Sequence, residues 1–119
     1  MPTPEPRRLL RKSVKQLTAA GTTDTLLFDQ VPHGEQWFVD WVSCMNDDAV
    51  ITSWYPFIRT ASGDYPLDQN ADIAQDFRHG MQLQTWLTEN EQLGVVIVGA
   101  TAGNDLHAWL IGHYREVES

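Results

Sequence analysis

Hydrophobic and polar residues alternate along much of this chain with the two-residue period of β-strands. The alternation is clearest in residues 37–46, where both predicted faces are largely apolar, which favours a strand in the middle of a sheet. One of these faces is expected to carry Trp37, Val39, Trp41, Ser43 and Met45. Further strands are predicted within residues 24–31, 51–60, 81–87, 93–100 and 106–114.

Short polar segments rich in glycine, proline and aspartate separate the predicted strands. Val31-Pro-His-Gly34 suits a tight reversal, because proline fixes φ near about −65° and glycine permits positive φ two residues later. Pro56 interrupts its strand and implies an edge position or a bulge, since it cannot donate to a ladder. Residues 68–80 have no regular period and leave room for a short helix around Asp72–Phe77.

Successive strands with short turns predict an all-β fold, a jelly-roll-like antiparallel β-sandwich formed by residues 18–119. The 119 residues suffice for one such domain. Residues 1–17 are expected to form an extended N-terminal arm, because three prolines in the first six residues exclude a helix or central strand there. A weak helical stripe and a first strand over residues 13–17 both fit the later part of the arm, and the strand is favoured by the strands that follow.

The net charge of −8 divides unevenly between these two parts. Residues 18–119 hold three basic against fifteen acidic residues, a net of −12, and this argues against nucleic acid as a partner of the sandwich. The arm carries a net of +4 and is the predicted partner-binding segment. Its basic residues are Arg7, Arg8, Arg11, Lys12 and Lys15.

The sequence shows neither a membrane span nor a secretory signal. No apolar run approaches the roughly 20 residues that cross a bilayer, and no apolar region follows the basic residues of the arm. We therefore expect a protein without a membrane partner that is made in a cytoplasm. The single cysteine, Cys44, lies in an apolar run and is interpreted as a small core residue rather than a catalytic thiol.

Candidate chemistry is sparse. His107 and His113 share a predicted strand face but lie roughly 20 Å apart along it, too far to bind one metal ion. The glycines at 94, 99 and 103 lack the ending of a phosphate-binding loop. We therefore expect no catalytic residue, no metal and no cofactor, and we interpret the protein as a non-enzyme.

Five tryptophans in so short a chain are the strongest compositional feature. Packing in the core or at a subunit interface is the favoured interpretation of Trp37, Trp41 and Trp109. The alternative is a carbohydrate-binding module, in which exposed indoles form platforms for sugar rings. Trp54 and Trp86 are the residues proposed for such a platform, or for an interface.

Three segments together resemble small virion proteins of tailed bacteriophages, and the likeness covers residues 25–114 in outline. The first runs from Leu26 through Val-Pro-His-Gly to Val39, with its strand ending at Asn46. The second is Tyr65-Pro-Leu, and the third runs from Leu87 through the apolar strand and glycine turn to Leu106. The motifs consist of turn and strand signals and contain no catalytic residues.

The resemblance implies a β-sandwich structural protein of the virion, assembled in the host cytoplasm. A capsid decoration or cement protein is the first expectation, with the major capsid protein or neighbouring virion subunits as partners and a homo-oligomer as the assembled form. A location at the head–tail junction or in the tail is the alternative within the virion. The basic arm and the tryptophans lie outside the recognised pattern and leave this choice open.

Overall fold

The computed structural model describes residues 8–16, 23–46, 51–67, 70–73, 79–100, 103 and 105–117, and every regular element in these ranges is a β-strand. The strands are β1 (Arg8–Gln16), β2 (Thr23–Leu27), β3 (Glu35–Asn46), β4 (Ile51–Thr60), β5 (Gly63–Pro66), β6 (Asn70–Ile73), β7 (His79–Leu87), β8 (Gln92–Val98) and β9 (Leu106–Glu116).

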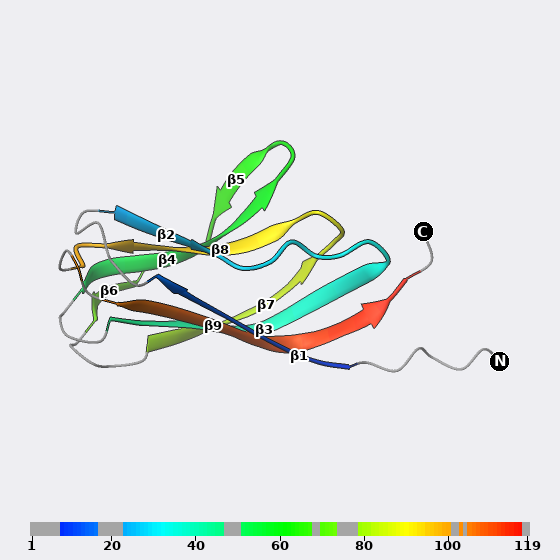
Figure 1. Cartoon of the computed structure of the whole chain (residues 1–119), viewed down its shortest axis with the longest axis horizontal. Helices are drawn as coiled ribbons and strands as arrows, with labels where there is room; N and C mark the ends of the chain where they lie inside the picture. The colour runs from blue at the N-terminus through cyan, green and yellow to red at the C-terminus, as the bar shows by residue number, and fades with distance from the viewer. Residues whose placement is uncertain are drawn as a thin grey trace.

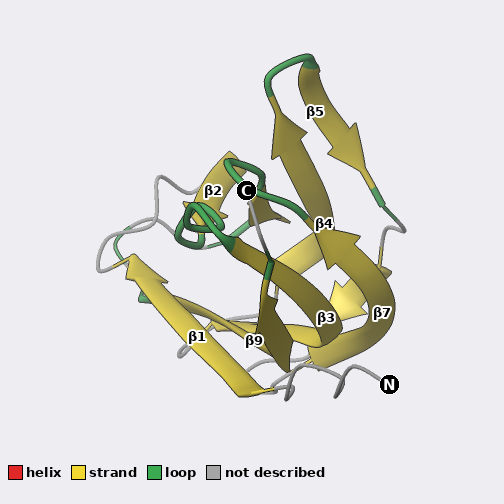
Figure 2. Ribbon diagram, turned by 90° about the vertical axis from the view of Figure 1, so that its right-hand side faces the viewer, coloured by secondary structure: helices red, strands yellow, loops and turns green. Residues whose placement is uncertain are grey.

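Two antiparallel sheets pack face to face, which confirms the predicted β-sandwich. One sheet has four strands in the order β1-β9-β3-β7 (Figure 1). The other has five, in the order β2-β8-β4-β5, with β6 pairing with β4 as well. The hairpin of β4 and β5 projects beyond the body of the sandwich (Figure 2). Strands far apart in sequence are therefore neighbours, as in jelly-roll-like folds.

Apolar side chains from both sheets fill the space between them. Trp37 and Trp54 are among the largest fully buried residues, and Leu93, Val95 and Ile97 of β8 contribute a continuous apolar row. Cys44 is also buried, which confirms its interpretation as a core residue. Burial of this surface is the main force holding the two sheets together.

Strand β1 is longer than the sequence predicts. It begins at Arg8 rather than at residue 13, and it pairs with β9 along its whole length, from Arg8 opposite Tyr114 to Gln16 opposite Leu106. Leu10 lies in the core, so the segment is held by packing as well as by the ladder. Most of the basic stretch is thus an edge strand of the sandwich, and only residues 1–7 of the expected arm precede it; these lie outside the described residues.

A β-bulge at Asp40 divides β3 into two halves. Val39 pairs with Gly112 and Trp41 with Ile111, so Asp40 has no opposing residue on β9. Trp37 and Val39 face the core before the bulge, and Val42 and Cys44 after it. The prediction that Trp41 shares a face with Trp37 is therefore wrong, because the extra residue turns Trp41 outward.

Pro56 lies in an interior strand, opposite Val95 of β8. On its other side β6 pairs with β4 as far as Trp54, and β5 begins pairing at Phe57. The proline therefore falls between two partner strands, where no donor is needed for a ladder. Its carbonyl oxygen still accepts a hydrogen bond of 2.8 Å from the Leu67 amide. The proline marks a local gap in the ladder rather than an edge strand.

Two further predictions can be compared with the described residues. Gly34 has a φ of +81°, which confirms the tight reversal after Pro32. The expected helix around Asp72–Phe77 is wrong at its start, since β6 runs through Ile73, and residues 74–78 lie outside the described ranges. Across the described ranges, no helix has the length and apolar character that crossing a membrane requires.

The bulge generates a first prediction, at Gly112. A β-carbon there would collide with the backbone carbonyl of Phe38, and backbone on a central strand pair cannot move aside as a side chain can. We expect Gly112→Ala to lower the free energy of unfolding by about 3 kcal/mol. The matched control is Gly80→Ala, whose β-carbon would meet only the far end of the Trp41 ring. Denaturant unfolding should show the larger loss for Gly112→Ala; equal losses would contradict the close backbone approach.

A second prediction concerns Cys44. Burial raises the pKa of its thiol, which keeps the group protonated and unreactive in the folded state. A thiol reagent such as iodoacetamide should modify the native protein slowly at pH 8 and rapidly in denaturant. The sign of the shift means that any stability linked to this thiol is lost at high pH, above its ordinary pKa. Rapid modification under native conditions would contradict the burial.

Candidate interaction surface

The outer face of the four-stranded sheet carries an unusual set of exposed apolar side chains. The exposed residues are Leu9 of β1, Ile111 of β9, Trp41 of β3 and Trp86 of β7, and the half-buried Trp109 of β9 lies on the same face. Leu9 is 56% exposed, Ile111 45%, and Trp41 and Trp86 42% each. Soluble proteins seldom gather several large exposed apolar residues on one flat face without a partner.

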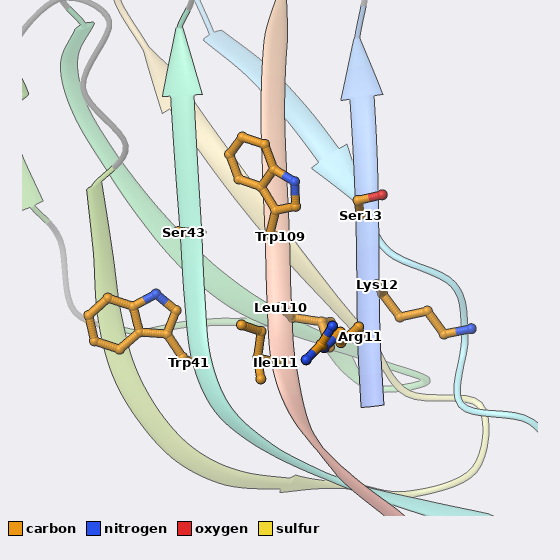
Figure 3. A pocket seen from close by; sticks show the side chains of 8 residues that line it. All are labelled: Arg11, Lys12, Ser13, Trp41, Ser43, Trp109, Leu110 and Ile111. Carbon is orange, nitrogen blue, oxygen red and sulfur yellow. The ribbon is translucent and has the colours of Figure 1, made fainter. Parts of the chain in front are cut away.

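The centre of this face is a block of four residues on β3 and β9. Trp109 lies beside Ser43, and Ile111 lies beside Trp41, according to the strand register. The two tryptophans therefore occupy one diagonal of the block, and the two smaller residues occupy the other. Figure 3 shows the two indoles rising from neighbouring strands with Ile111 between them and Ser43 in the strand that carries Trp41.

A shallow cavity of about 320 Å³ opens within and beside this block. Its lining includes both indoles, Ser43, and Arg11 and Ser13 from β1. Ser43 is 2% exposed although it lies on the outer face, so it forms the floor beneath the larger side chains. Small residues flank Trp109 on both sides, because Ser13 and Ser43 are its cross-strand neighbours.

Close packing fixes the Trp41 indole. Its ring lies over Gly80 of β7, so close that a β-carbon at that position would collide with the ring. Trp109 stacks on His107, with ring centroids 5.6 Å apart and an interplanar angle of 5°. Both indoles are thus oriented by their neighbours, and the surface is formed before any partner binds.

The outer face of the five-stranded sheet differs in how one of its aromatic rings is covered. Phe57 of β4 is only 2% exposed, and its ring occupies the space beside Gly94. The Arg59 guanidinium lies over this ring at 5.5 Å and is held there by two hydrogen bonds to Asp64, of 2.9 and 3.1 Å. The pKa of Asp64 is lowered, chiefly by this hydrogen bonding to Arg59. The chain thus covers Phe57 with its own residues, whereas Trp41 and Trp86 on the outer face of the four-stranded sheet are each 42% exposed.

The two tryptophans predicted as platforms lie in different environments. Trp54 is fully buried between the sheets, so the prediction that it forms a glycan platform or an interface is wrong. Trp86 is exposed, but it packs against Phe38 with ring centroids 4.9 Å apart, and Arg115 lies 5.0 Å from its ring centroid. It belongs to the aromatic face rather than to an isolated platform.

Intramolecular ion pairs engage three of the four described basic residues of β1. Arg8 lies 3.7 Å from Glu116, Lys12 3.9 Å from Asp29, and Lys15 3.5 Å from Asp105. The pKa of Arg8 is raised, first by a hydrogen bond with Tyr114 and then by the charge of Glu116. Lys12 also lies 5.6 Å from the Trp37 ring centroid.

Arg11 differs from these residues because none of the described residues forms an ion pair with it. It extends onto the outer face at the margin of the cavity, whereas Lys12 extends toward the opposite side of β1 (Figure 3). The cations predicted to bind a partner together are therefore separated, and Arg11 is the one placed beside the aromatic block. Arg7 lies outside the described residues.

His33, His107 and His113 lie where the sequence predicts, whereas His79 begins strand β7. His107 and His113 lie on the outer face of β9, and His113 pairs with Asp40 at 3.3 Å. His33 contacts Glu89 in the turn after β2. Within the described ranges, no three His, Cys, Asp or Glu side chains gather as metal ligands would.

Sequence patterns could have placed Trp109 and Ile111 on an outer face, but not Trp41. In residues 106–114 the apolar side chains Leu106, Ala108 and Leu110 alternate with a second set containing both histidines, and this second set faces outward. Trp41 could not be placed, because no residue type identifies Asp40 as a bulge.

Comparisons with known proteins show the fold of this chain, but they assign it no family and no function. No family model and no curated protein matches the sequence. A candidate alpha-L-fucosidase from Bacteroides thetaiotaomicron matches with a TM-score of 0.53 and 7% identity, over 83% of this chain and 22% of that chain. Pseudomonas aeruginosa AlgX matches with a TM-score of 0.51 and 12% identity, over 90% of this chain and 27% of that chain.

A third match covers most of both chains. The core of Drosophila NLP, in a study of pentamer formation and histone binding, has a TM-score of 0.48 and 11% identity, over 90% of this chain and 99% of that chain. Proteins of unrelated function thus share this β-sandwich with the chain, and none of them points to phage proteins in particular. The fold alone does not assign a function.

A third prediction separates the buried and exposed tryptophans. Trp54→Ala should lower the free energy of unfolding by about 3–5 kcal/mol, because it opens a large cavity between the sheets. Trp86→Ala should cost about 1 kcal/mol or less, since much of its ring already contacts solvent. Denaturant unfolding followed by circular dichroism measures both. A loss for Trp86→Ala as large as that for Trp54→Ala would contradict the assignment of Trp86 to an exposed face.

Proposed function

We propose that this chain is a non-enzymatic structural protein of a bacteriophage virion, of the capsid decoration type, that binds the major capsid protein and stabilises the head. The observation that carries the proposal is the outer surface of the four-stranded sheet. It combines an apolar, preformed aromatic face with Arg11 of the edge strand, which pairs with none of the described residues, and such a surface serves packing against protein subunits. The segment resemblance to phage virion proteins supports the same assignment.

The chemistry of the face favours a protein partner over a glycan. Leu9 and Ile111 are aliphatic and expose about half of their surface. Ile111 lies opposite Trp41, and Leu9 extends the apolar surface to the edge strand β1. Sugar-binding platforms pair exposed indoles with polar side chains that hydrogen-bond hydroxyl groups. This face instead mixes aromatic and aliphatic residues over all four strands, as protein interfaces do.

Electrostatics suggest how the edge strand takes part. Arg11 lies at the margin of the aromatic face with a guanidinium that pairs with none of the described residues, and arginine is enriched at protein interfaces. A carboxylate on the capsid protein would pair with it without competing against an existing ion pair. The remaining cations of β1 already neutralise acidic residues of the sandwich and contribute less to docking. The same surface would suit a position at the head–tail junction or in the tail.

A fourth prediction tests this proposal with particles assembled from the major capsid protein of the same phage. The wild-type chain should sediment with the particles, and Arg11→Glu should weaken its binding roughly tenfold, because a carboxylate partner would then face a like charge. The matched control is Arg59→Glu, which makes the same charge change on the projecting hairpin of the other sheet. It should bind like the wild type.

Two outcomes would overturn the proposal in different ways. Failure of the wild-type chain to sediment with capsid particles would remove the decoration role, and labelled virions viewed by electron microscopy would then show whether it lies in the tail. Equal weakening by Arg11→Glu and Arg59→Glu would show that only net charge matters, and would exclude the β1 edge as the contact.

A further inference from the structure

We propose that the outer face of the four-stranded sheet packs against the same face of a second copy of this chain, about a two-fold axis parallel to strands β3 and β9. In the free chain, the second copy would occupy the aromatic face described above, including Arg11 of β1, and on a particle the capsid protein would take its place. Its test uses the purified chain without capsid particles, so the dimer and the proposed function can fail separately.

The arrangement of the central block is self-complementary. Trp109 and Trp41 occupy one diagonal, and Ser43 and Ile111 occupy the other. A half-turn about an axis in the plane of the sheet and between β3 and β9 exchanges the two diagonals. Trp109 of one copy then lies over Ser43 of the other, and Trp41 lies over Ile111. Each protruding indole meets a recess or a smaller side chain, as an isologous interface requires.

The flanking strands extend this complementarity. The same half-turn places β1 of one copy over β7 of the other. In the strand registers, Ser13 and Gly80 lie in the row of Trp109, whereas Arg11 and Gln82 lie in the row of Trp41. Arg11 would therefore face the Gln82 amide of the second copy. Leu9 and Trp86, the exposed apolar residues of the edge strands, would come together at one end of the interface.

Charge distinguishes this axis from its alternative. A half-turn about an axis perpendicular to the strands would also exchange the diagonals, but it would stack β1 on β1. On its outer face β1 carries the cations Arg11 and Lys15, and Lys15 already pairs with Asp105. The two Arg11 guanidiniums, which no described residue pairs, would therefore be brought near each other and would repel. The axis parallel to the strands instead sets β1 against β7, which carries no lysine, arginine, aspartate or glutamate.

The structure of each copy favours this packing. Neighbouring residues already fix both indoles, so little side-chain freedom is lost on association. Sheets that pack face to face lie about 10 Å apart with their strands nearly aligned, which an axis along the strands satisfies. The closed sandwich is not disturbed, because only the outward side chains of β1, β3, β7 and β9 take part.

A fifth prediction tests the dimer by sedimentation velocity over a range of protein concentrations. The wild-type chain should form dimers, and Ile111→Glu should raise the dimer dissociation constant at least about thirtyfold, because it places charge in the centre of the interface. The matched control is Tyr65→Glu, which adds the same charge at a residue 53% exposed on β5, in the other sheet. It should dimerise like the wild type, and both variants should unfold cooperatively.

Cysteine pairs test the orientation. Arg11→Cys combined with Gln82→Cys should be linked into dimers by a bismaleimide that spans about 8 Å, because facing sheets lie about 10 Å apart, whereas either change alone should not. The two positions lie three strand spacings apart in one chain, roughly 14 Å, so the same reagent cannot join them within it. The native Cys44 is buried and does not compete.

Three results would overturn the proposal. A wild-type chain that stays monomeric at high concentration would show that another partner covers the face. A dimer unaffected by Ile111→Glu would place the interface elsewhere. Efficient crosslinking by Arg11→Cys alone would show that β1 meets β1, and would replace the proposed axis with the perpendicular one.

Discussion

The pairing of β3 with β9 is the constraint on which the rest of the four-stranded sheet depends. These strands form its centre, and Asp40 is inserted between two registers that are each regular. At the same place, Gly112 lets the β3 backbone approach β9 more closely than any side chain would allow. The inserted residue changes which side chains of β3 face the core, so that Trp37 closes the interior while Trp41 is turned to the surface.

That change accounts for the difference between the two outer faces. On the five-stranded sheet, Phe57 is covered by an arginine that an aspartate holds in position. On the four-stranded sheet, the outward Trp41 joins Trp109 and Ile111 in a central block, where Trp41 remains 42% exposed and Ile111 45%. The exposed block follows from the strand register, and its diagonal arrangement of large and small residues is the basis of the proposed dimer.

Most of the described basic residues of β1 form ion pairs within the chain's own fold. Three basic residues of β1 pair with acidic residues that follow β2, precede β9 or end β9. They tie the edge strand to its own sandwich, and their charge also discourages the open edge from pairing with other strands. Only Arg11 combines a position on the aromatic face with a guanidinium that the described residues leave unpaired. The asymmetry of charge between the two parts of the chain is therefore largely cancelled within the fold.

The sequence by itself determined the all-β class, strands β2, β3, β4, β7, β8 and β9, the turn at Gly34 and the burial of Cys44, because alternation, glycine and proline act over a few residues. It also indicated that β9 has one apolar and one mixed face. Tertiary structure alone decided that Arg8–Gln16 is an edge strand, that Trp54 is buried, and that Trp41 faces outward. These outcomes depend on which strands pair and in which register, and a single inserted residue reverses every face that follows it.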